Sequence, residues 1–367
     1  MRRVGVEEEL LLVDPGSGCP VALASTALAR APHVAGRGAD DEPGGVVEEE
    51  LQQEQIETDT KPCASMDELA AEIRAQREAA ARTAAAAGAA LAALATSPLK
   101  VAPTVTPKPR YRRMVHEFGL TAAEQLSCGV HVHVEIESDD EGVAALDRIR
   151  VWLPVLVALT ANSPFYQGRD SGYESFRSQL WQRWPSAGPV DVFGTPERYH
   201  ATVEALVATG TLLDPGMIYF DARLAQEYPT VEIRVGDVCQ HPDDAVLLAA
   251  LCRGLVSTAV ADAGESRPVP DVRTDFIRVA TWRAGRSGLA GALVDPRSWR
   301  PAPAWHVVDA LVDHVRPALE DAGDLDLVRD HLVALRERGN GAALQRAAYA
   351  ATGRLEDVVR AAVELTT

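Results

Sequence analysis

The sequence predicts an α+β fold, or one with a mixed sheet, because the expected strands are scattered between helices and several are neighbours along the chain. The strands alternate apolar and polar residues, so each has one face suited to a core. From about residue 241 the chain reads mainly as helix. Its 367 residues suit one large domain over 1–367, with the sheet motifs in 4–240 and a mainly helical part in 241–367.

The first expected strand, residues 4–13, carries three consecutive glutamates in an apolar run. A period of two places Glu7 and Glu9 on one face and turns Glu8 to the apolar face, where we expect a salt-bridged or edge residue. Adjacent carboxylates repel each other, and a hard divalent cation between them would relieve that repulsion. A solvated edge strand is the alternative for this segment alone. The turn residues 14–18 end the strand.

The next segments read as loop, strand and helix in turn. Residues 36–45 are rich in glycine, aspartate and proline and predict a loop. Residues 46–57 predict a strand paired with the first one, with helix as the alternative. A capping box at 65–68 begins a helix, and the alanine-rich run continues it to about residue 95. Prolines at positions 98, 103, 107 and 109 then predict an extended connector.

Residues 128–137 alternate strictly, with His131, His133 and Glu135 on one face and valines on the other. A helix is expected over 142–161, with a kink at Pro154. The remaining elements are a long loop over 162–195, strands near 217–223 and 230–236, and helices after 241 with breaks near 264–270 and 284–303.

Several of these strands share an apolar face backed by a face of carboxylate, imidazole or guanidinium. The first strand offers Glu7 and Glu9, the third His131, His133 and Glu135, and the last Glu232 and Arg234. The second offers two alternative faces, either Glu48, Glu50, Gln52 and Glu54 or, on the opposite parity, Gln53, Gln55 and Glu57. If the faces converge, their oxygen-rich donors suit several Mg²⁺ or Mn²⁺ ions, which could hold a nucleoside triphosphate. The alternatives are hydrogen-bonded histidines and a glutamate–arginine pair that simply neutralises itself. Neither G-x-G-x-x-G after a strand nor a Walker motif occurs.

The loop over 162–195 is unusually rich in arginine and aromatic residues. Its arginines Arg169, Arg177 and Arg183, with Tyr173, favour a substrate-covering loop with anion-binding guanidiniums. A plain surface loop is the alternative.

Composition narrows the class of protein. The net charge of −17 argues against nucleic acid or an anionic membrane as the main partner. The five scattered cysteines fit a reducing compartment and form no zinc framework. We expect no signal peptide, no apolar segment approaching the roughly 20 residues of a membrane span, and therefore a cytoplasmic protein.

The motifs also occur together in family order. They are Gly5–Leu10, Glu50–Glu57, Cys128–Val134, Asn162–Tyr173 and Pro229–Val235. With these segments the chain resembles the carboxylate–amine ligases of the glutamate–cysteine ligase type 2 family over about residues 4–240. The resemblance implies a glutamine-synthetase-like fold, with a curved antiparallel sheet and helices packed on its outer face. It also implies ATP-dependent γ-glutamyl ligation through a γ-glutamyl phosphate.

The resemblance also assigns roles by position. It implies that Glu7, Glu9, Glu50, Glu57, His133 and Glu232 bind metal, that Arg234, Arg169 and Arg177 are catalytic, and that His131, His133, Arg183 and Tyr173 contact the nucleotide. The implied cofactor is Mg²⁺ or Mn²⁺, with ATP as co-substrate. The implied small-molecule substrates are glutamate and an amino acid such as cysteine.

Two departures from the family pattern concern the amine acceptor. Residues 58–63 are more polar than in many relatives, and Tyr166 stands where many carry tryptophan. The simplest activity is glutamate–cysteine ligation, with a non-cysteine acceptor as the alternative. A guanidino or carboxylate kinase on the same fold is also compatible with the sequence, and so is a non-catalytic nucleotide-binding protein. Exposed sheet edges are compatible with a homodimer.

Overall fold

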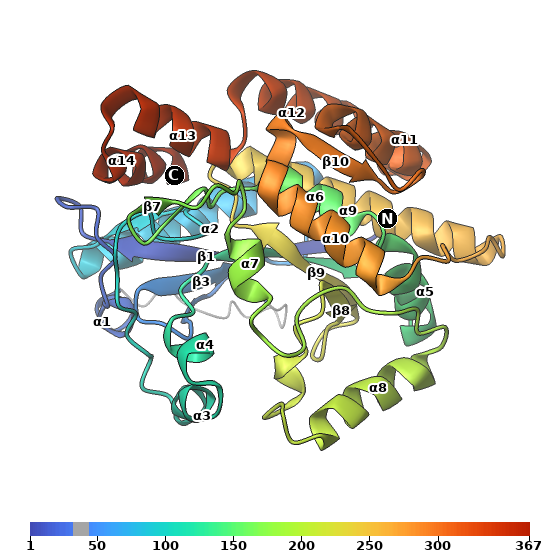
Figure 1. Ribbon diagram of the computed structural model, residues 1–367, viewed down its shortest axis with the longest axis horizontal. Coiled ribbons are helices and arrows are strands. Elements are labelled where there is room, and N and C mark those ends of the chain that lie inside the picture. The colour runs from blue at the N-terminus through green and yellow to red at the C-terminus, as the bar shows by residue number, and fades with distance from the viewer. Residues whose placement is uncertain (32–43) are drawn as a thin grey trace.

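The computed structural model describes residues 1–31 and 44–367, and within them the central element is a seven-stranded antiparallel sheet (Figure 1). Its strands lie in the order β2–β3–β1–β5–β9–β8, and β4 also pairs with β1. Their bounds are Val4–Val13 for β1, Val47–Glu49 for β2, Gln55–Asp59 for β3, Ala90–Ala92 for β4, Gly129–Glu135 for β5, Ala222–Leu224 for β8 and Thr230–Asp237 for β9. The predicted α+β class is confirmed.

The strand register brings the predicted polar faces together. On β1, Glu7 lies opposite His131 of β5, while Glu9 lies opposite Glu57 of β3. On the other side of β5, His133 lies opposite Glu232 of β9. Because alternate residues of a strand share a face, these side chains project from the same side of the sheet.

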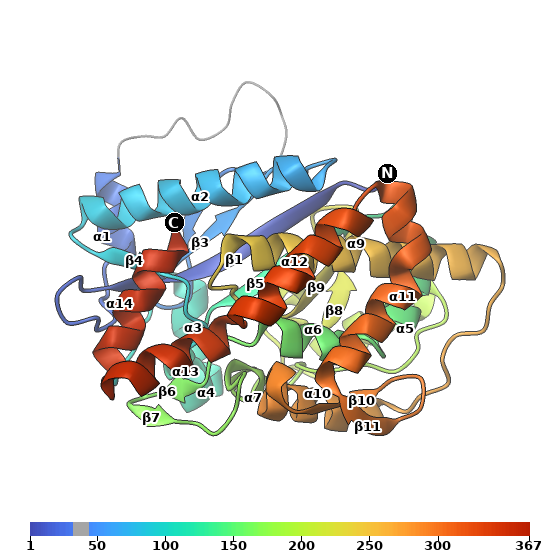
Figure 2. The ribbon, with the colours of Figure 1, turned by 90° about the horizontal axis from the view of Figure 1, so that it is seen from above.

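Long helices cover the opposite face. Helices α2 (Met66–Ala86) and α9 (Pro242–Gly264) contact β1, and α5 (Asp139–Ile149) and α6 (Leu153–Thr160) contact β9 (Figure 2). The predicted capping box is confirmed, since the Ser65 side chain accepts from the Glu68 N–H while the Glu68 carboxylate accepts from the Ser65 N–H.

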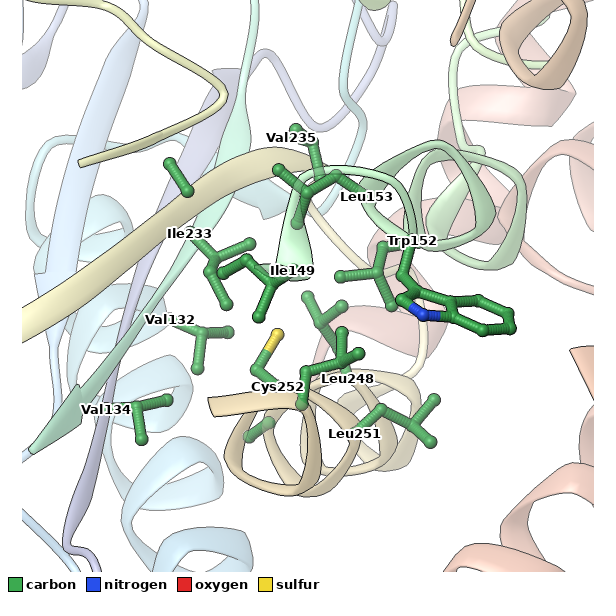
Figure 3. Close-up of a cluster of buried hydrophobic side chains, with 14 of the residues drawn as sticks. Val132, Val134, Ile149, Trp152, Leu153, Ile233, Val235, Leu248, Leu251 and Cys252 are labelled. Carbon is green, nitrogen blue, oxygen red and sulfur yellow. The ribbon is translucent and has the colours of Figure 1, made fainter. Parts of the chain in front are cut away.

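The core lies between the sheet and these helices. Figure 3 shows Val132 and Ile233 from the sheet packed against Ile149, Leu248 and Cys252 from the helices. Ile233 is 1% exposed and Val132 fully buried. Each such side chain contributes about 1.5–3 kcal/mol through burial. The same cluster continues through the C-terminal helices as far as Leu335.

Helix α9 corrects one sequence-based expectation. It spans 23 residues and is long and apolar enough, by length and composition, to cross a membrane, although no segment of that kind was expected from the sequence. However, 78% of its apolar window is buried inside the fold, where it contacts α5, α11 and the sheet. The apolar composition of α9 therefore reflects its position in the core.

Glu8 and Arg77 form a buried ion pair on the helix-covered face. The Arg77 Nε and Nη2 atoms donate to the two Glu8 carboxylate oxygens at 2.8 and 2.7 Å. Arg77 also donates to the carbonyls of Cys239, Gln240 and Thr366. The expectation of a salt-bridged Glu8 is confirmed, and the pair ties β1 to α2, to the end of β9 and to the last helix.

The remaining elements surround this framework. They are α1 (Ala24–Arg30), α3 (Pro109–Phe118), α4 (Leu120–Ala123), β6 (Phe165–Tyr166), β7 (Arg169–Asp170), α7 (Arg177–Trp181), α8 (Pro196–Ala208), η1 (Pro215–Met217), α10 (Thr274–Ser287), η2 (Gly288–Ala290), β10 (Ala292–Asp295), β11 (Arg300–Pro303), α11 (Ala304–Ala322), α12 (Leu325–Arg338), α13 (Gly341–Thr352) and α14 (Leu355–Thr366). Figure 1 shows α3, α4 and α8 on the side of the sheet opposite α2, α13 and α14.

Some boundaries differ from the expectation. The strand expected over 46–57 is two short strands, β2 and β3, separated by a turn. The helix expected to reach residue 95 ends at Ala86, near Gly88, and residues 90–92 instead form β4, because pairing with β1 outweighs alanine's helix propensity. The connector contains an unexpected helix, α3, which starts at Pro109.

Three further boundaries also depend on tertiary context. The helix expected over 142–161 is divided into α5 and α6, with Pro154 in the first turn of α6. The expected strand near 217–223 is mostly η1 and loop, leaving only the three residues of β8. A β10–β11 hairpin interrupts the helical C-terminal part. Most of the loop expected over 36–45 lies outside the described residues.

Candidate active site

The open face of the sheet forms the floor of a cavity of 320 Å³. Its lining contains eight of the polar candidates, namely Glu7, Glu9, Glu50, Glu57, His131, His133, Glu232 and Arg234, together with Gln55. The other candidates, Glu48, Gln52, Gln53, Glu54 and Glu135, do not line it. These residues come from β1, β3, β5, β9 and the turn after β2. Strand alternation predicts each face separately, and the antiparallel register places the faces side by side.

Glu7 is held by two imidazoles. Its carboxylate oxygens lie 3.0 Å from Nδ1 of His131 and 3.1 Å from Nε2 of His133. Burial alone would raise the pKa of Glu7, but the two histidines outweigh it and hold that pKa well below its ordinary value. Burial, followed by the nearby Arg234 guanidinium, lowers the pKa of His131 to about 3, so this imidazole is neutral.

A neutral His131 that donates through Nδ1 keeps a lone pair on its other nitrogen. Among the described residues Nε2 of His131 has no hydrogen-bond partner, although it is buried. An imidazole that gives one N–H to a carboxylate and presents its other nitrogen is the arrangement that proteins use for metal ligation.

Glu9, Glu50 and Glu57 form an acidic triad whose carboxylate oxygens lie within 4.8 Å of one another. Burial and then the charge of Glu9 raise the pKa of Glu50 to about 7. Burial, followed by repulsion from the neighbouring carboxylates, raises the pKa of Glu57 well above its ordinary value. In the part of the chain that the structure describes, the Glu9 carboxylate accepts directly from the backbone N–H of Gly129, at 2.5 Å. The Glu50 carboxylate accepts from the Leu51 N–H, also at 2.5 Å. Two such bonds do not neutralise three carboxylates, so the triad concentrates negative charge.

Glu232 is shared by two arginines. The Arg223 Nε atom donates to it at 2.7 Å, and Arg234 on its own strand also pairs with it. Burial and then repulsion from Arg223 lower the pKa of Arg234 to about 10, so its guanidinium remains charged at neutral pH. Arg223 was not among the sequence candidates. Its only signal is its register opposite Glu232, which a single strand pattern does not contain.

Helix α7 places Arg177 behind the triad. The Arg177 side chain is almost completely buried, at 1% exposure. Its guanidinium carbon lies 5.4 Å from the centre of the Trp181 ring, and the guanidinium carbon of Arg234 lies 5.8 Å from the same ring centre. Within the described part of the chain, Nε and Nη2 of Arg177 and Nε of Arg234 lack hydrogen-bond partners. Buried, unused N–H donors beside an acidic site suit the oxygens of a bound anion.

A buried network fixes the segment that leads to Arg177. The Asp237 carboxylate, at the end of β9, accepts from the Asn162 N–H and from the hydroxyls of Ser163 and Ser175 at 2.7–2.9 Å. The Ser163 hydroxyl accepts in turn from the Arg177 N–H. The loop is therefore anchored to the sheet at the point from which α7 starts.

Arg177 does not line the cavity directly, and neither do the other three candidates from the same loop. Arg169 is exposed on the short strand β7. Arg183 is exposed and pairs with Glu124 at 3.2 Å. Tyr173 packs edge-on against Trp282 of α10, with ring centroids 6.2 Å apart. A loop has no repeating period, so its sequence does not show which side chains turn inward. The prediction that these three residues act together with Arg177 rested only on the loop's composition.

The opposite wall was not expected from the sequence. It includes Arg110 and Tyr111 of α3, which the predicted connector concealed, together with Met114, Trp184 and Tyr219. Trp184 is 2% exposed, and its indole N–H has no partner among the described residues. This wall is more apolar than the sheet face across the cavity.

The donor set fits divalent cations. Three groups have ligand atoms within 4.8 Å of one another: Glu7, His133 and Glu232; Glu7, Glu57 and His131; and Glu9, Glu50 and Glu57. Carboxylate oxygens with a minority of imidazole match the preference of Mg²⁺ and Mn²⁺. Burial and mutual repulsion raise the carboxyl pKa values of the triad, and a bound cation would relieve that repulsion.

Comparison with known proteins agrees with this geometry. A Streptomyces avermitilis protein with the provisional name glutamate–cysteine ligase 2-1 is 55% identical over 366 residues, covering 100% of this chain and 99% of that protein. Among solved structures, a glutamate–cysteine ligase from Francisella tularensis in complex with AMP has a TM-score of 0.70 at 13% identity, over 100% of this chain and 88% of that one.

A bifunctional glutathione synthetase from Pasteurella multocida has a TM-score of 0.69 at 16% identity, over 100% of this chain and 52% of that one. These two structures show that the fold is the one implied by the sequence resemblance. The profile of glutamate–cysteine ligase family 2 matches residues 3–361. The chain therefore belongs to glutamate–cysteine ligase family 2, a family of ligases.

Proposed function

We propose that this protein is an ATP-dependent γ-glutamyl ligase, which joins the γ-carboxyl group of glutamate to the amino group of an amino acid, most simply cysteine. The observation that carries the proposal is the convergence of carboxylates, imidazoles and a guanidinium from four strands in one cavity. Membership of a ligase family supports it, as does the AMP bound to the Francisella neighbour.

In the first step an oxygen of the glutamate γ-carboxylate attacks the terminal phosphorus of ATP. The bond from that phosphorus to ADP breaks, and γ-glutamyl phosphate forms. Such a transfer needs positioning and charge stabilisation more than covalent chemistry from the protein. Arg234 lines the cavity and supplies fixed positive charge and an unused N–H donor for the moving phosphoryl oxygens, while Arg177, buried behind the lining, adds positive charge.

In the second step the amine nitrogen attacks the acyl carbon. A C–N bond forms, the C–O bond to phosphate breaks, and the nitrogen loses a proton. Divalent cations held by the glutamates and histidines of the cavity would neutralise the phosphate charge in both steps. The protein's own role is to orient the substrates against the sheet and to keep Arg177 and Arg234 in place.

The apolar wall bears on the acceptor. Met114 of α3 and Trp184, which follows α7, form the apolar part of the cavity wall. An acceptor amino acid with an apolar side chain is therefore the second candidate, beside cysteine.

The test is ADP release with ATP, Mg²⁺, glutamate and a panel of amino acids, with mass spectrometry to find the one that gains a glutamyl unit. We expect ADP and a γ-glutamyl dipeptide with at least one acceptor. Absence of ADP with every amine, under conditions where ATP and Mg²⁺ bind, would refute the proposal. A phosphorylated product that accumulates without any amine would indicate a kinase.

Variants localise the activity. Glu7→Gln and Glu232→Gln should each abolish turnover without unfolding the protein, because each removes a charge from the cation-binding face. Glu48→Gln is the matched control, since Glu48 is exposed on β2 and does not line the cavity. Wild-type turnover in both cavity variants would remove these residues from the site.

A further inference from the structure

The outer face of α10 carries an exposed apolar patch. Phe276, Val279 and Trp282 are 54%, 62% and 42% exposed, whereas most large apolar side chains in the described chain are buried. Single exposed apolar residues are common, but three within seven positions on one helix are not. Tyr173 and Trp299 extend the patch, through edge-on contacts with Trp282 and Phe276.

The exposed face has the spacing of a helix–helix seam. Asp275, Val279, Trp282 and Arg286 follow one another at intervals of four, three and four residues, so they form one stripe along the helix. The buried face of the same helix, with Ile277, Ala280 and Ala284, points to the core. Helix α10 is therefore apolar on both sides, and only one side is covered by the described part of this chain.

The ends of the stripe carry opposite charges. Asp275 lies in the first turn of α10 and Arg286 in the last, about 16 Å apart along the axis. In an antiparallel pair of α10 helices, Asp275 of one copy faces Arg286 of the other, and Val279 faces Trp282. In a parallel pair, like charges would face each other. The stripe is thus complementary to itself about a two-fold axis.

We propose that α10 is the interface of a homodimer, in which the α10 helices of two copies pack antiparallel through Val279 and Trp282 with Asp275–Arg286 ion pairs at both ends. Asp275 already pairs with Arg273 of its own chain at 2.8 Å, but both side chains are largely exposed, so Asp275 can exchange or share that partner. The net charge of −17 on each copy makes this local match necessary, because the molecules otherwise repel.

The size of the patch predicts a modest affinity. Roughly 300 Å² of apolar side chain is exposed at Phe276, Val279 and Trp282, given the usual areas of such residues. A standard interface buries about 800 Å² per partner. The rest of the buried area must come from the charged ends of the stripe and from Tyr173, over whose ring the Arg286 guanidinium lies. Because the apolar area is small, the dimer should dissociate on dilution.

The experiment is sedimentation velocity of the full chain over a range of concentrations, without substrates. We expect a reversible monomer–dimer equilibrium in the wild type. Val279→Glu should weaken association at least tenfold, because it buries a charge in the seam. Val333→Glu is the matched control, since Val333 is 56% exposed on α12, away from the patch, and this variant should associate like the wild type.

A charge exchange tests the antiparallel register independently of folding defects. Asp275→Arg and Arg286→Asp should each weaken the dimer, and the double variant should restore it, because the ion pairs re-form with reversed polarity. A wild type that stays monomeric at about 0.2 mM overturns the proposal, and so does association that Val279→Glu leaves unchanged. A double variant no tighter than the single variants overturns the antiparallel register.

Discussion

Glu50 gives a quantitative test of charge in the candidate site. Its pKa is raised to about 7 by burial and by the charge of Glu9, so the folded protein holds this proton more tightly than the unfolded chain does. The stability that this provides is complete below pH about 4.5 and is lost as the pH rises through about 7. The shift corresponds to about 3 kcal/mol at alkaline pH. Coulomb's law gives at least about 3.5 kcal/mol for two carboxylate charges no more than 4.8 Å apart at an effective dielectric constant of 20, so repulsion of this size can contribute substantially to the shift.

Replacing Glu50 by glutamine should therefore raise the free energy of unfolding at pH about 8 by about 2–3 kcal/mol, and change it little at pH about 5. The assay is urea denaturation with a chelator present. Added Mg²⁺ should stabilise the wild type at pH about 8 but stabilise Glu50→Gln much less, since one charge that attracts the ion is gone. The exposed Glu48→Gln variant should match the wild type throughout. If Glu50→Gln destabilises the chelated protein at pH about 8, the inferred repulsion is wrong.

Three further predictions concern the ion pair, a buried acid and the loop arginines. Arg77→Met leaves Glu8 buried and unpaired and should cost about 3–5 kcal/mol in urea denaturation; a loss below about 1 kcal/mol would contradict this. Burial raises the pKa of Asp221 to about 7, so the free energy of unfolding falls as the pH rises from about 4 to about 7. Asp221→Asn should therefore recover up to about 4 kcal/mol of that free energy at pH about 8. An unchanged denaturation midpoint at that pH would contradict this. Arg177→Lys should lower kcat about tenfold to a hundredfold, because an ammonium does not keep the planar guanidinium's place between Glu9 and the Trp181 ring behind the cavity. Arg169→Lys, at the surface, should leave kcat unchanged, and equal loss in both variants would return Arg169 to the site.

The sequence predicts the sheet face of the site well because strand periodicity determines which residues share a face. Glu7 and Glu9, like His131 and His133, could be placed from alternation alone. Alternation does not show which strands lie next to each other in the sheet. The expectation that these faces meet in one site came from the family resemblance. Arg223 shows the limit, since its place depends on pairing with Glu232.

Residues outside regular strands were predicted less well for a related reason. Arg177 and Arg183 have the same chemistry and lie six positions apart, yet one is buried beside Glu9 and the other pairs with Glu124 at the surface. The difference arises from tertiary contacts, chiefly the hydrogen bonds through which Asp237 holds the segment before α7. Such contacts join positions far apart in the chain, and a local pattern does not contain them.

The three consecutive glutamates of β1 connect folding to chemistry. Because the side-chain period of a strand is two, a slip of one residue would turn Glu8 into the cavity and send Glu7 and Glu9 into the core. That slip would place Glu7 or Glu9 at the position of Glu8, where it could pair with the fully buried Arg77 guanidinium. The other glutamate would then lie on the apolar, helix-covered face without a partner, at a cost of several kcal/mol for the buried charge. An apolar residue, Val6 or Leu10, would at the same time enter the cavity. Three consecutive glutamates and a single buried arginine therefore fit together only when Glu8 faces Arg77 and both of its neighbours face the cavity.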